Sequence, residues 1–429
     1  MDSIIRNTIT IGLPTLMLFI AIAATGKTGE AAVWSGLVKV GGSFGMLIGL
    51  GVLVFVGFVA NSFSYFVVDS LLVRFYQKRR ELEQPEQLVI EIDKLPITND
   101  LKIKLKWAVL HRNNQIISLK HVILKWFILA AILDALLSIA GYLGAFNLFF
   151  ELSSHFKLQY LLAGLSIFIF FALVRSKKIW LLVSAFCIII NLAEIVPWYF
   201  PAPAFAGSTP GQNLRILHSN VLTSNRRYSD VISLVKAEKP DIAVFVEVST
   251  SWVRELAVLS EMFPYYSSYQ ESDRFGSAIY SKLPLNNTSV KAFSKQRKSL
   301  LADVTVQGKI ISLILVHPTV PIKHHSFIAR NKQLTAIGEY AAQVKNPLIV
   351  LGDFNITMWS PFYKNMVKTG NLRNARSGFG ILPTWPTFMP LAYIPIDHFL
   401  VSKEIGVFKI RTGRNVGSDH LPLITDLVI

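Results

Sequence analysis

Cysteine and charged residues are both scarce in this chain of 429 residues. Its one cysteine, Cys187, lies in an apolar run, so the chain can form no internal disulfide and no thiolate cluster for a metal. Charged residues make up 16% of the sequence and hydrophobic residues 52%, whereas soluble domains carry about 25% charged residues. The composition predicts a membrane part joined to a globular domain. Oxygen and imidazole ligands would have to hold any metal.

Five apolar runs in the first half have the length of membrane spans, which need about 17 to 25 residues. They are residues 8–24, 42–66, 123–148, 158–174 and 179–200. Basic residues fill the connecting segments 74–120 and 175–178, whereas segments 25–41 and 149–157 hold few. The positive-inside rule then predicts a multi-pass protein of the cell (inner) membrane, with a cytoplasmic N-terminus and an extracytoplasmic C-terminal half. The first run could instead be a signal peptide, which would leave the later spans oriented the same way.

The sequence divides into five parts by this pattern. We expect two transmembrane helices in residues 1–75, a basic cytoplasmic loop in 76–121, three transmembrane helices in 122–200, a linker in 201–212 and a globular domain in 213–429. The basic stretch 101–110 is amphipathic, so it suits either an anionic membrane surface or a solvated helix or strand.

Small and acidic residues inside the apolar runs each have two interpretations. Gly41, Gly45 and Gly49 repeat at four-residue spacing, which would let helices approach closely. This face predicts either a homo-oligomer formed through residues 1–75 or packing within one chain. Asp134 and Glu194 are acids within spans, which often mark function. We favour a structural or interfacial role for both.

Residues 213–429 follow a different pattern, in which short apolar runs alternate with helical segments. This alternation predicts an α/β domain. Polar side chains follow or interrupt the predicted strands near their ends. They are Asn220, Glu247, His317, Asp353, Asn355, Asp397, Asp419 and His420.

Strand ends at one sheet edge converge in space, so these polar side chains are expected to form one site. Several carboxylates together repel one another unless a cation neutralises them. Carboxylate and amide oxygens without thiolates favour Mg²⁺ or Mn²⁺. Two histidines beside such an ion indicate acid–base chemistry on a phosphate ester.

The motifs LRILHSNVL, PDIAVFVEV, FGSAIYSKLPL, LILVHP, LIVLGDFN, IDHFLVS and GSDHLPL follow one another in this order. Together they resemble the endonuclease/exonuclease/phosphatase superfamily, whose fold is the four-layer DNase-I-like α/β sandwich. The combination of GDFN with a C-terminal SDH is specific. The spans from about residue 123 followed by this domain also resemble bacterial membrane-anchored members. Residues 1–120 resemble no family that we can name.

The resemblance implies a metal site. Glu247 would be the principal ligand, with Asn220 and Asp419 close to the ion or its waters. Asp353 would orient or deprotonate the attacking water, and Asn355 would hold the scissile phosphate.

The resemblance also implies roles for the histidines. His420 would act on the phosphate or its nucleophile, with Asp397 fixing its tautomer. His317 would stabilise the phosphate or protonate the leaving oxygen. In DNase-I-like nucleases a glutamate partners the residue that matches His317, but here Arg274 falls near its expected place, beside Asp273. The other histidines of this domain are interpreted as core residues: His218, His324, His325 and His398.

Basic residues outnumber acidic residues in the globular half, and the segment KAFSKQRK concentrates them. We expect the substrate to be bound by Arg274, Lys291, Lys295, Arg297 and Lys298. A basic face beside a phosphoesterase site predicts a nucleic acid substrate, DNA or RNA, outside the cytoplasm. Two alternatives remain. One is a phosphodiesterase or phosphatase acting on lipid head groups or another envelope phosphoester. The other is an oligomeric membrane assembly protein with a secondary or inert catalytic domain.

Overall fold

The computed structural model describes residues 72–73, 75–95, 97–111, 119–200, 213–270, 276–294 and 297–429. The chain separates into two compact units, Met1–Leu129 and Ala130–Ile429. The spans expected at 8–24 and 42–66, the glycine-spaced face and the linker 201–212 all lie outside the described residues.

The segment predicted to be a basic cytoplasmic loop between membrane spans, residues 76–121, contains two helices. Helix α4 covers Pro85–Lys94 and helix α5 covers Asn99–Leu110. Their apolar side chains recur every three or four residues and pack into a small core of Tyr76, Leu88, Ile92, Leu101, Leu105 and Val109. The amphipathic stretch 101–110 is therefore helical, and one side of it packs within this small core, whereas Ile103, Trp107 and Leu110 stay exposed.

Three helical segments among the described residues are long and apolar enough to cross a membrane: Ile123–Leu143, Leu148–Leu173 and Lys178–Tyr199. They comprise α6 (Leu119–Ala140), η2 (Gly141–Leu143), α7 (Leu148–Ser153), η3 (Ser154–Phe156), α8 (Lys157–Leu173), α9 (Lys178–Ile195) and η4 (Val196–Tyr199). They coincide with three of the five predicted spans, although the second begins ten residues earlier than the predicted 158–174. Large apolar side chains such as Leu162, Ile169 and Leu182 stay exposed, as lipid-facing residues would.

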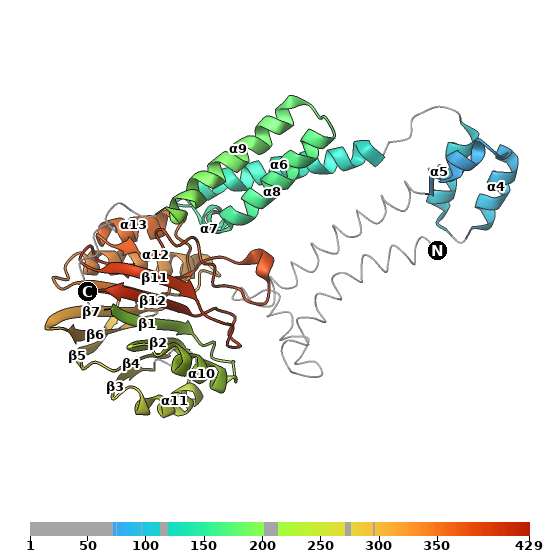
Figure 1. Ribbon diagram of the computed structural model, residues 1–429. Helices are drawn as coiled ribbons and strands as arrows, with labels where there is room; N and C mark the ends of the chain where they lie inside the picture. Colours follow the sequence, from blue (N-terminus) through green and yellow to red (C-terminus); the bar gives the residue numbers. More distant parts are fainter. Residues whose placement is uncertain are drawn as a thin grey trace. The chain divides into compact units, whose positions relative to one another are not determined.

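The C-terminal domain contains two mixed six-stranded sheets, ordered β11-β12-β1-β2-β4-β3 and β5-β6-β7-β8-β10-β9 (Figure 1). The strands of the first sheet are β1 (Asn213–Asn220), β2 (Ile242–Val248), β3 (Tyr265–Tyr269), β4 (Gly276–Ser281), β11 (Gly406–Thr412) and β12 (Leu423–Val428). Those of the second are β5 (Leu285–Ala292), β6 (Lys298–Val306), β7 (Lys309–Val316), β8 (Leu348–Asp353), β9 (Arg373–Asn374) and β10 (Asp397–Val401). The helices of the domain are α10 (Tyr228–Glu238), α11 (Thr250–Leu256), η6 (Ala257–Glu261), α12 (His324–Ala341), α13 (Pro361–Thr369) and η7 (Pro390–Ala392).

The two sheets pack face to face, with helices covering their outer faces. Successive residues of a strand point to opposite faces of its sheet, and both faces of the central strands are apolar and buried. One face therefore packs against the other sheet and the opposite face packs against helices. In β2, Val244 faces the other sheet, whereas Phe245 packs against α10 and α11. In β8, Leu351 faces the first sheet and Val350 packs against α12 and α13. This layering confirms the predicted α/β fold of the domain.

The strand register places the last residues of β7 and β8 and the first residue of β10 beside one another, at one end of the second sheet. Strands β7 and β8 are parallel, with Val316 opposite Gly352, and Asp397 of β10 lies opposite Asp353. Gly352 has φ 142°, and a Cβ there would lie 1.9 Å from the Val316 carbonyl oxygen. Glycine therefore allows the close approach of β8 to β7 that sets the position of Asp353.

Candidate functional site

Glu247 projects from a distortion at the end of β2. The pairing of β2 with β4 shifts register between Val246 and Val248, and Glu247 itself has φ 61°. Gly276 of β4 accommodates this, because a Cβ there would lie 2.1 Å from the Val248 carbonyl oxygen. A bulge re-aims a side chain that regular alternation would direct elsewhere. The strained backbone at Glu247 thus sets the direction in which its carboxylate points.

Asn220, at the end of β1, joins carboxylates from both sheets. Its Nδ2 donates to Glu247 Oε1 and to Asp353 Oδ2, each at 3.0 Å. Its Oδ1 accepts from the Leu222 N–H at 3.0 Å, which fixes the orientation of the amide. Two acids from different sheets therefore lie within reach of a single side chain.

The turn after β8 holds Asp353 and Asn355 together. The Asn355 N–H donates to Asp353 Oδ1 at 2.9 Å, and Asn355 has φ 51°. Its Nδ2 donates to the Pro318 carbonyl oxygen at 3.0 Å. Asparagine is among the few residues that tolerate this left-handed conformation, which explains its place in GDFN.

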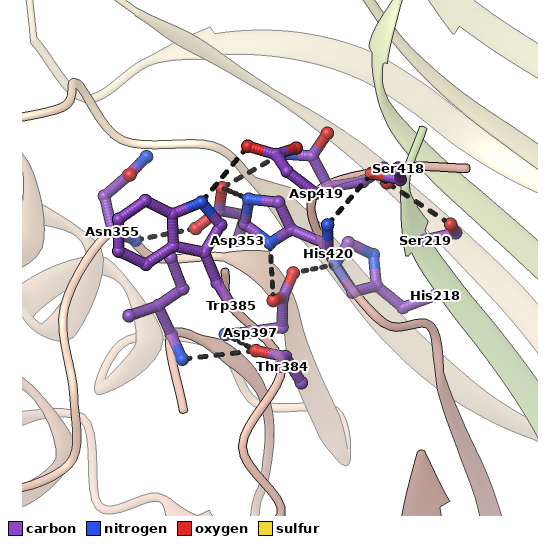
Figure 2. A network of polar contacts seen from close by, with 12 residues as sticks. His218, Ser219, Asp353, Asn355, Thr384, Trp385, Asp397, Ser418, Asp419 and His420 are labelled. Carbon is purple, nitrogen blue, oxygen red and sulfur yellow. Dashed lines mark hydrogen bonds and ion pairs between the residues drawn. The ribbon is translucent and has the colours of Figure 1, made fainter. Parts of the chain in front are cut away.

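Asp397 lies between two histidines (Figure 2). Its Oδ2 contacts His420 Nδ1 at 2.8 Å, and its Oδ1 contacts His218 Nε2 at 2.9 Å. All three side chains are buried. The other ring nitrogen of His420, Nε2, lies 3.6 Å from Asp353 Oδ2. His420 is thus held between Asp397 and the carboxylate cluster.

His218 was interpreted as a core residue, and it is fully buried. It also belongs to the polar network, which sequence reasoning missed. A signal was present, because His218 and Asn220 lie two residues apart on β1 and side chains in a strand alternate with period two. Ser418 was also missed. Its Oγ donates to the Asn220 carbonyl oxygen at 2.7 Å and accepts from the His420 N–H at 3.1 Å.

His317 points at the two acids that Asn220 joins. Its Nε2 lies 3.8 Å from Glu247 Oε1 and 3.6 Å from Asp353 Oδ2. That nitrogen is buried and has no hydrogen-bond partner. Burial, the charge of Arg297 and that of His420 together hold the pKa of His317 well below its usual value. The ring is therefore neutral near pH 7.

The carboxylates of the site differ in charge state because their surroundings differ. Burial raises the pKa of Asp353 to about 7, against the attraction of His420. Burial and the charge of Asp419 raise the pKa of Glu247. Burial also opposes ionisation of Asp397, but His420 and His218 outweigh it and hold its pKa well below the usual range. The pKa of His420 lies well above its usual value despite burial, because Asp397 and Asp353 attract the proton.

These side chains fit a divalent metal ion. Glu247, His317 and Asp353 form one group whose ligand atoms lie within 4.8 Å of one another, and Asp353, Asp397 and His420 form another. Asp419 Oδ1 is buried without a partner, whereas its Oδ2 accepts from Trp385 Nε1 at 3.1 Å. A cation bound here would neutralise the clustered acids and engage the ligand atoms that have no hydrogen-bond partner. Oxygen donors favour a hard cation.

The structure brings together eight of the residues predicted for the site. These are Asn220, Glu247, His317, Asp353, Asn355, Asp397, Asp419 and His420. Among the predicted substrate-binding residues, Lys291 places its Nζ 4.6 Å from the Tyr340 ring centre and Lys298 places its Nζ 5.1 Å from that of Tyr269. Arg274 and Lys295 lie outside the described residues, as does the region in which the glutamate partner of His317 was expected.

Residues 213–420 match the model of the endonuclease/exonuclease/phosphatase family. Among solved structures, a humanized TDP2 of D. rerio is 16% identical, with 51% of this chain and 99% of that chain covered and a TM-score of 0.44. An endonuclease/exonuclease/phosphatase from Beutenbergia cavernae is 18% identical over 51% and 72% of the chains, with a TM-score of 0.43. The human Nocturnin catalytic domain is 17% identical over 52% and 97%, with a TM-score of 0.41. None of the curated proteins matches the chain.

Proposed function

Because the C-terminal domain belongs to the endonuclease/exonuclease/phosphatase family, a family of phosphoric ester hydrolases, we propose that the chain is a membrane-tethered, divalent-metal-dependent phosphodiesterase whose substrate is DNA or RNA. One observation carries the proposal. Asn220 joins Glu247 and Asp353 across the two sheets, beside a histidine whose ring nitrogen has no partner.

Glu247 would hold the metal ion, Mg²⁺ or Mn²⁺, with Asn220 and Asp419 near it. When bound, such an ion supplies positive charge that stabilises the phosphoryl oxygens as negative charge builds on them. Asp419 is suited to this position because its Trp385 contact fixes the carboxylate and leaves Oδ1 available. The amide of Asn220 would hold the Glu247 carboxylate, the principal ligand, beside that of Asp353.

Asp353 would take a proton from the attacking water. Its raised pKa of about 7 makes it a stronger base than an ordinary carboxylate. The Asn220 amide and the Asn355 N–H each donate to one of its oxygens, so the carboxylate cannot rotate. One N–H of Asn355 Nδ2 donates to the Pro318 carbonyl oxygen, and the second N–H would donate to the scissile phosphate.

His420 would stabilise the phosphoryl group as a cation, with Asp397 fixing its orientation through Nδ1. His317 is neutral near pH 7 and keeps Nε2 free of hydrogen bonds. This charge state favours hydrogen bonding to the phosphate over protonation of the leaving oxygen. Together the residues would give a phosphomonoester and an alcohol, without a covalent intermediate.

The basic start of β6 supports a polyanionic substrate. Leu300 pairs with Leu315, so Lys298, two residues earlier on β6, lies at the end of the sheet where His317 follows β7. The charge of Arg297 reaches His317 strongly enough to lower its pKa. A nucleic acid bound at the site would have further phosphates beyond the scissile one for these charges to contact.

Cleavage of plasmid DNA and of RNA in Mg²⁺ tests the substrate class. We expect both Arg297→Gln and Lys298→Gln to raise the KM for nucleic acid about tenfold and to weaken its dependence on salt, because each removes one phosphate-seeking charge. Hydrolysis of bis(p-nitrophenyl) phosphate by Lys298→Gln should not change. The matched control is Lys409→Gln, at an exposed position of β11. Hydrolysis of the small ester without cleavage of DNA or RNA would refute the nuclease proposal.

Metal affinity should fall as the pH is lowered from 8 to 6. Burial raises the pKa of Asp353 to about 7, so this carboxyl holds a proton in the metal-free protein at lower pH, and the proton must leave when a cation binds beside it. We expect the loss to approach tenfold per pH unit for each proton displaced. Calorimetric titration with Mn²⁺ in two buffers of different ionisation enthalpy would count the protons released. A pH-independent affinity without proton release would contradict this assignment.

A lipid head group is the second candidate substrate, because the rim of the site contacts a membrane-type helix. Gln159 of α8 donates from Nε2 to the carbonyl oxygens of Leu391, at 3.2 Å, and Tyr393, at 3.0 Å. The loop they belong to follows Trp385, which contacts Asp419. The Leu391 side chain is 89% exposed. Phospholipid vesicles offered in place of nucleic acid decide between the two candidates: their hydrolysis by a protein that leaves DNA and RNA intact would favour lipid.

We also propose that the protein lies in the cell membrane with its catalytic domain outside the cytoplasm. The three apolar helices and the distribution of basic residues support this placement. Alkaline phosphatase fused after Ile429 should be active, and inactivity would overturn the orientation. Self-association through residues 1–75, the basis of the assembly hypothesis, would appear as a multimer in native mass spectrometry, and a strict monomer would exclude it.

A further inference from the structure

Glu151 and Arg330, which carry opposite charges, are fully buried and do not belong to the polar cluster of the candidate site. Glu151 lies in α7, between the apolar helices α6 and α8, and Arg330 lies in α12 of the catalytic domain. Both are 0% exposed, and Arg330 Nη2 lies 3.1 Å from Glu151 Oε2. A buried charge is strongly disfavoured without its partner. This ion pair therefore joins α7 to the catalytic domain as a specific contact.

Arg330 also binds the turn that carries the catalytic residues. Its Nη1 donates to the Asn355 carbonyl oxygen at 2.8 Å, and its Nε donates to Asn331 Oδ1 at 2.8 Å. Asn355 has the left-handed backbone conformation, and its N–H holds Asp353 Oδ1. The guanidinium thus fixes the carbonyl group of a residue whose N–H orients the proposed base.

His155 of η3 makes a second connection to the same turn. Its Nε2 lies 3.2 Å from Glu151 Oε1, and its Nδ1 lies 2.9 Å from Thr357 Oγ1. Thr357 follows Asn355 by two residues. Residues 148–156 therefore reach the catalytic turn by two routes, through Arg330 and through Thr357. Both routes begin at Glu151.

We propose that Glu151, His155 and Arg330 are positioning residues, and that α7 with η3 sets the geometry of the turn bearing Asp353 and Asn355. The proposal rests on the proposed hydrolase function. None of the three positioning residues touches the reacting atoms in this account. A segment of the membrane-anchoring region is then part of the catalytic apparatus. Displacement of a reacting group by about 1 Å can lower a rate up to about 100-fold, so a modest shift of this turn is measurable.

The test uses the full-length protein in detergent micelles, with bis(p-nitrophenyl) phosphate and Mg²⁺. Arg330→Lys keeps the charge but replaces the planar fork, whose two nitrogens contact the Asn355 carbonyl and Glu151 separately, with a single nitrogen. We expect kcat to fall about tenfold with KM within about twofold of the wild type. Glu151→Gln, which keeps the shape and removes the charge, should change kcat in the same direction.

A double-variant comparison separates positioning from general stability. If Arg330 acts by orienting Asp353 through this turn, Arg330→Lys should lower kcat much less in an Asp353→Ala background than in the wild-type background. An equal loss in both backgrounds would overturn the proposal. If Arg330→Lys does not fold, Thr357→Val is measured instead. Valine is nearly isosteric with threonine, so this change removes only the hydrogen bond with His155. Its kcat should fall about threefold at an unchanged unfolding temperature.

The matched control is Lys364→Gln, which breaks a different contact between an apolar helix and the domain. Lys364 Nζ lies 2.9 Å from both Glu194 carboxylate oxygens, and its side chain is 51% exposed. Its kcat should equal that of the wild type. Wild-type kcat in the folded Arg330→Lys or Thr357→Val protein would overturn the inference while leaving the proposed function intact. An inactive wild-type protein would refute the proposed function instead.

Discussion

Replacement of Glu247 by glutamine should lower hydrolysis of any phosphodiester substrate at least about 1,000-fold at saturating Mg²⁺. The glutamine keeps the size of the side chain and can still contact the Asn220 amide, so the fold should persist. It removes the charge that the bulge at the end of β2 directs into the site. Initial rates with bis(p-nitrophenyl) phosphate measure the effect.

Glu255→Gln provides the control for the Glu247 variant. Glu255 lies on the exposed side of α11, the helix that follows β2, so the same chemical change is made on the neighbouring element. It should retain the wild-type rate. A Glu247→Gln protein with more than about a tenth of the wild-type rate would show that this carboxylate does not hold an essential ion.

Asp397→Asn should lower kcat about 100-fold or more while leaving the protein folded. Asp397 accepts from both His420 and His218, and it keeps its negative charge because those two rings outweigh the effect of burial. An amide cannot stabilise a cationic His420, so the proton should leave that ring at lower pH. The alkaline limb of the pH–rate profile should therefore move to lower pH.

The control for Asp397 is Asp303→Asn, in the same sheet. Asp303 lies on β6 and accepts from the Ser312 hydroxyl at 2.7 Å. This change should leave both the rate and the pH profile as in the wild type. If Asp397→Asn lowers kcat without moving the alkaline limb, the carboxylate supports the fold around His420 but does not set its charge.

The site residues could be predicted from the sequence because they sit at the ends of recognisable strands. Asp353 lies in the motif GDFN, which follows a run of apolar residues. Asp419 and His420 lie in the C-terminal motif SDH. The bulge at Glu247 could not be predicted, since a register shift depends on the partner strand and on the close approach of Gly276. The strand pattern indicates that an acid ends β2 but not the direction in which its carboxylate points.

Contacts between distant segments were beyond sequence reasoning for a similar reason. Nothing near Glu151 in the chain indicates that Arg330 will neutralise it, and hydropathy alone counts Glu151 within a candidate span that begins at Leu148. The buried ion pair instead attaches α7 to the catalytic domain. A helix was one of the alternatives for 101–110, which forms most of α5, whereas α4 was not predicted, although Leu88 and Ile92 already repeat with helical spacing.

Metal dependence is the central claim, and hydrolysis by the wild-type protein after removal of divalent ions tests it most directly. The full-length protein is treated with EDTA, exchanged into metal-free buffer and assayed with bis(p-nitrophenyl) phosphate before and after Mg²⁺ or Mn²⁺ is added back. We predict no hydrolysis above background without metal and a saturable return of the rate with either ion. An undiminished rate in the presence of the chelator would contradict a metal-centred site built on Glu247, Asn220 and Asp419.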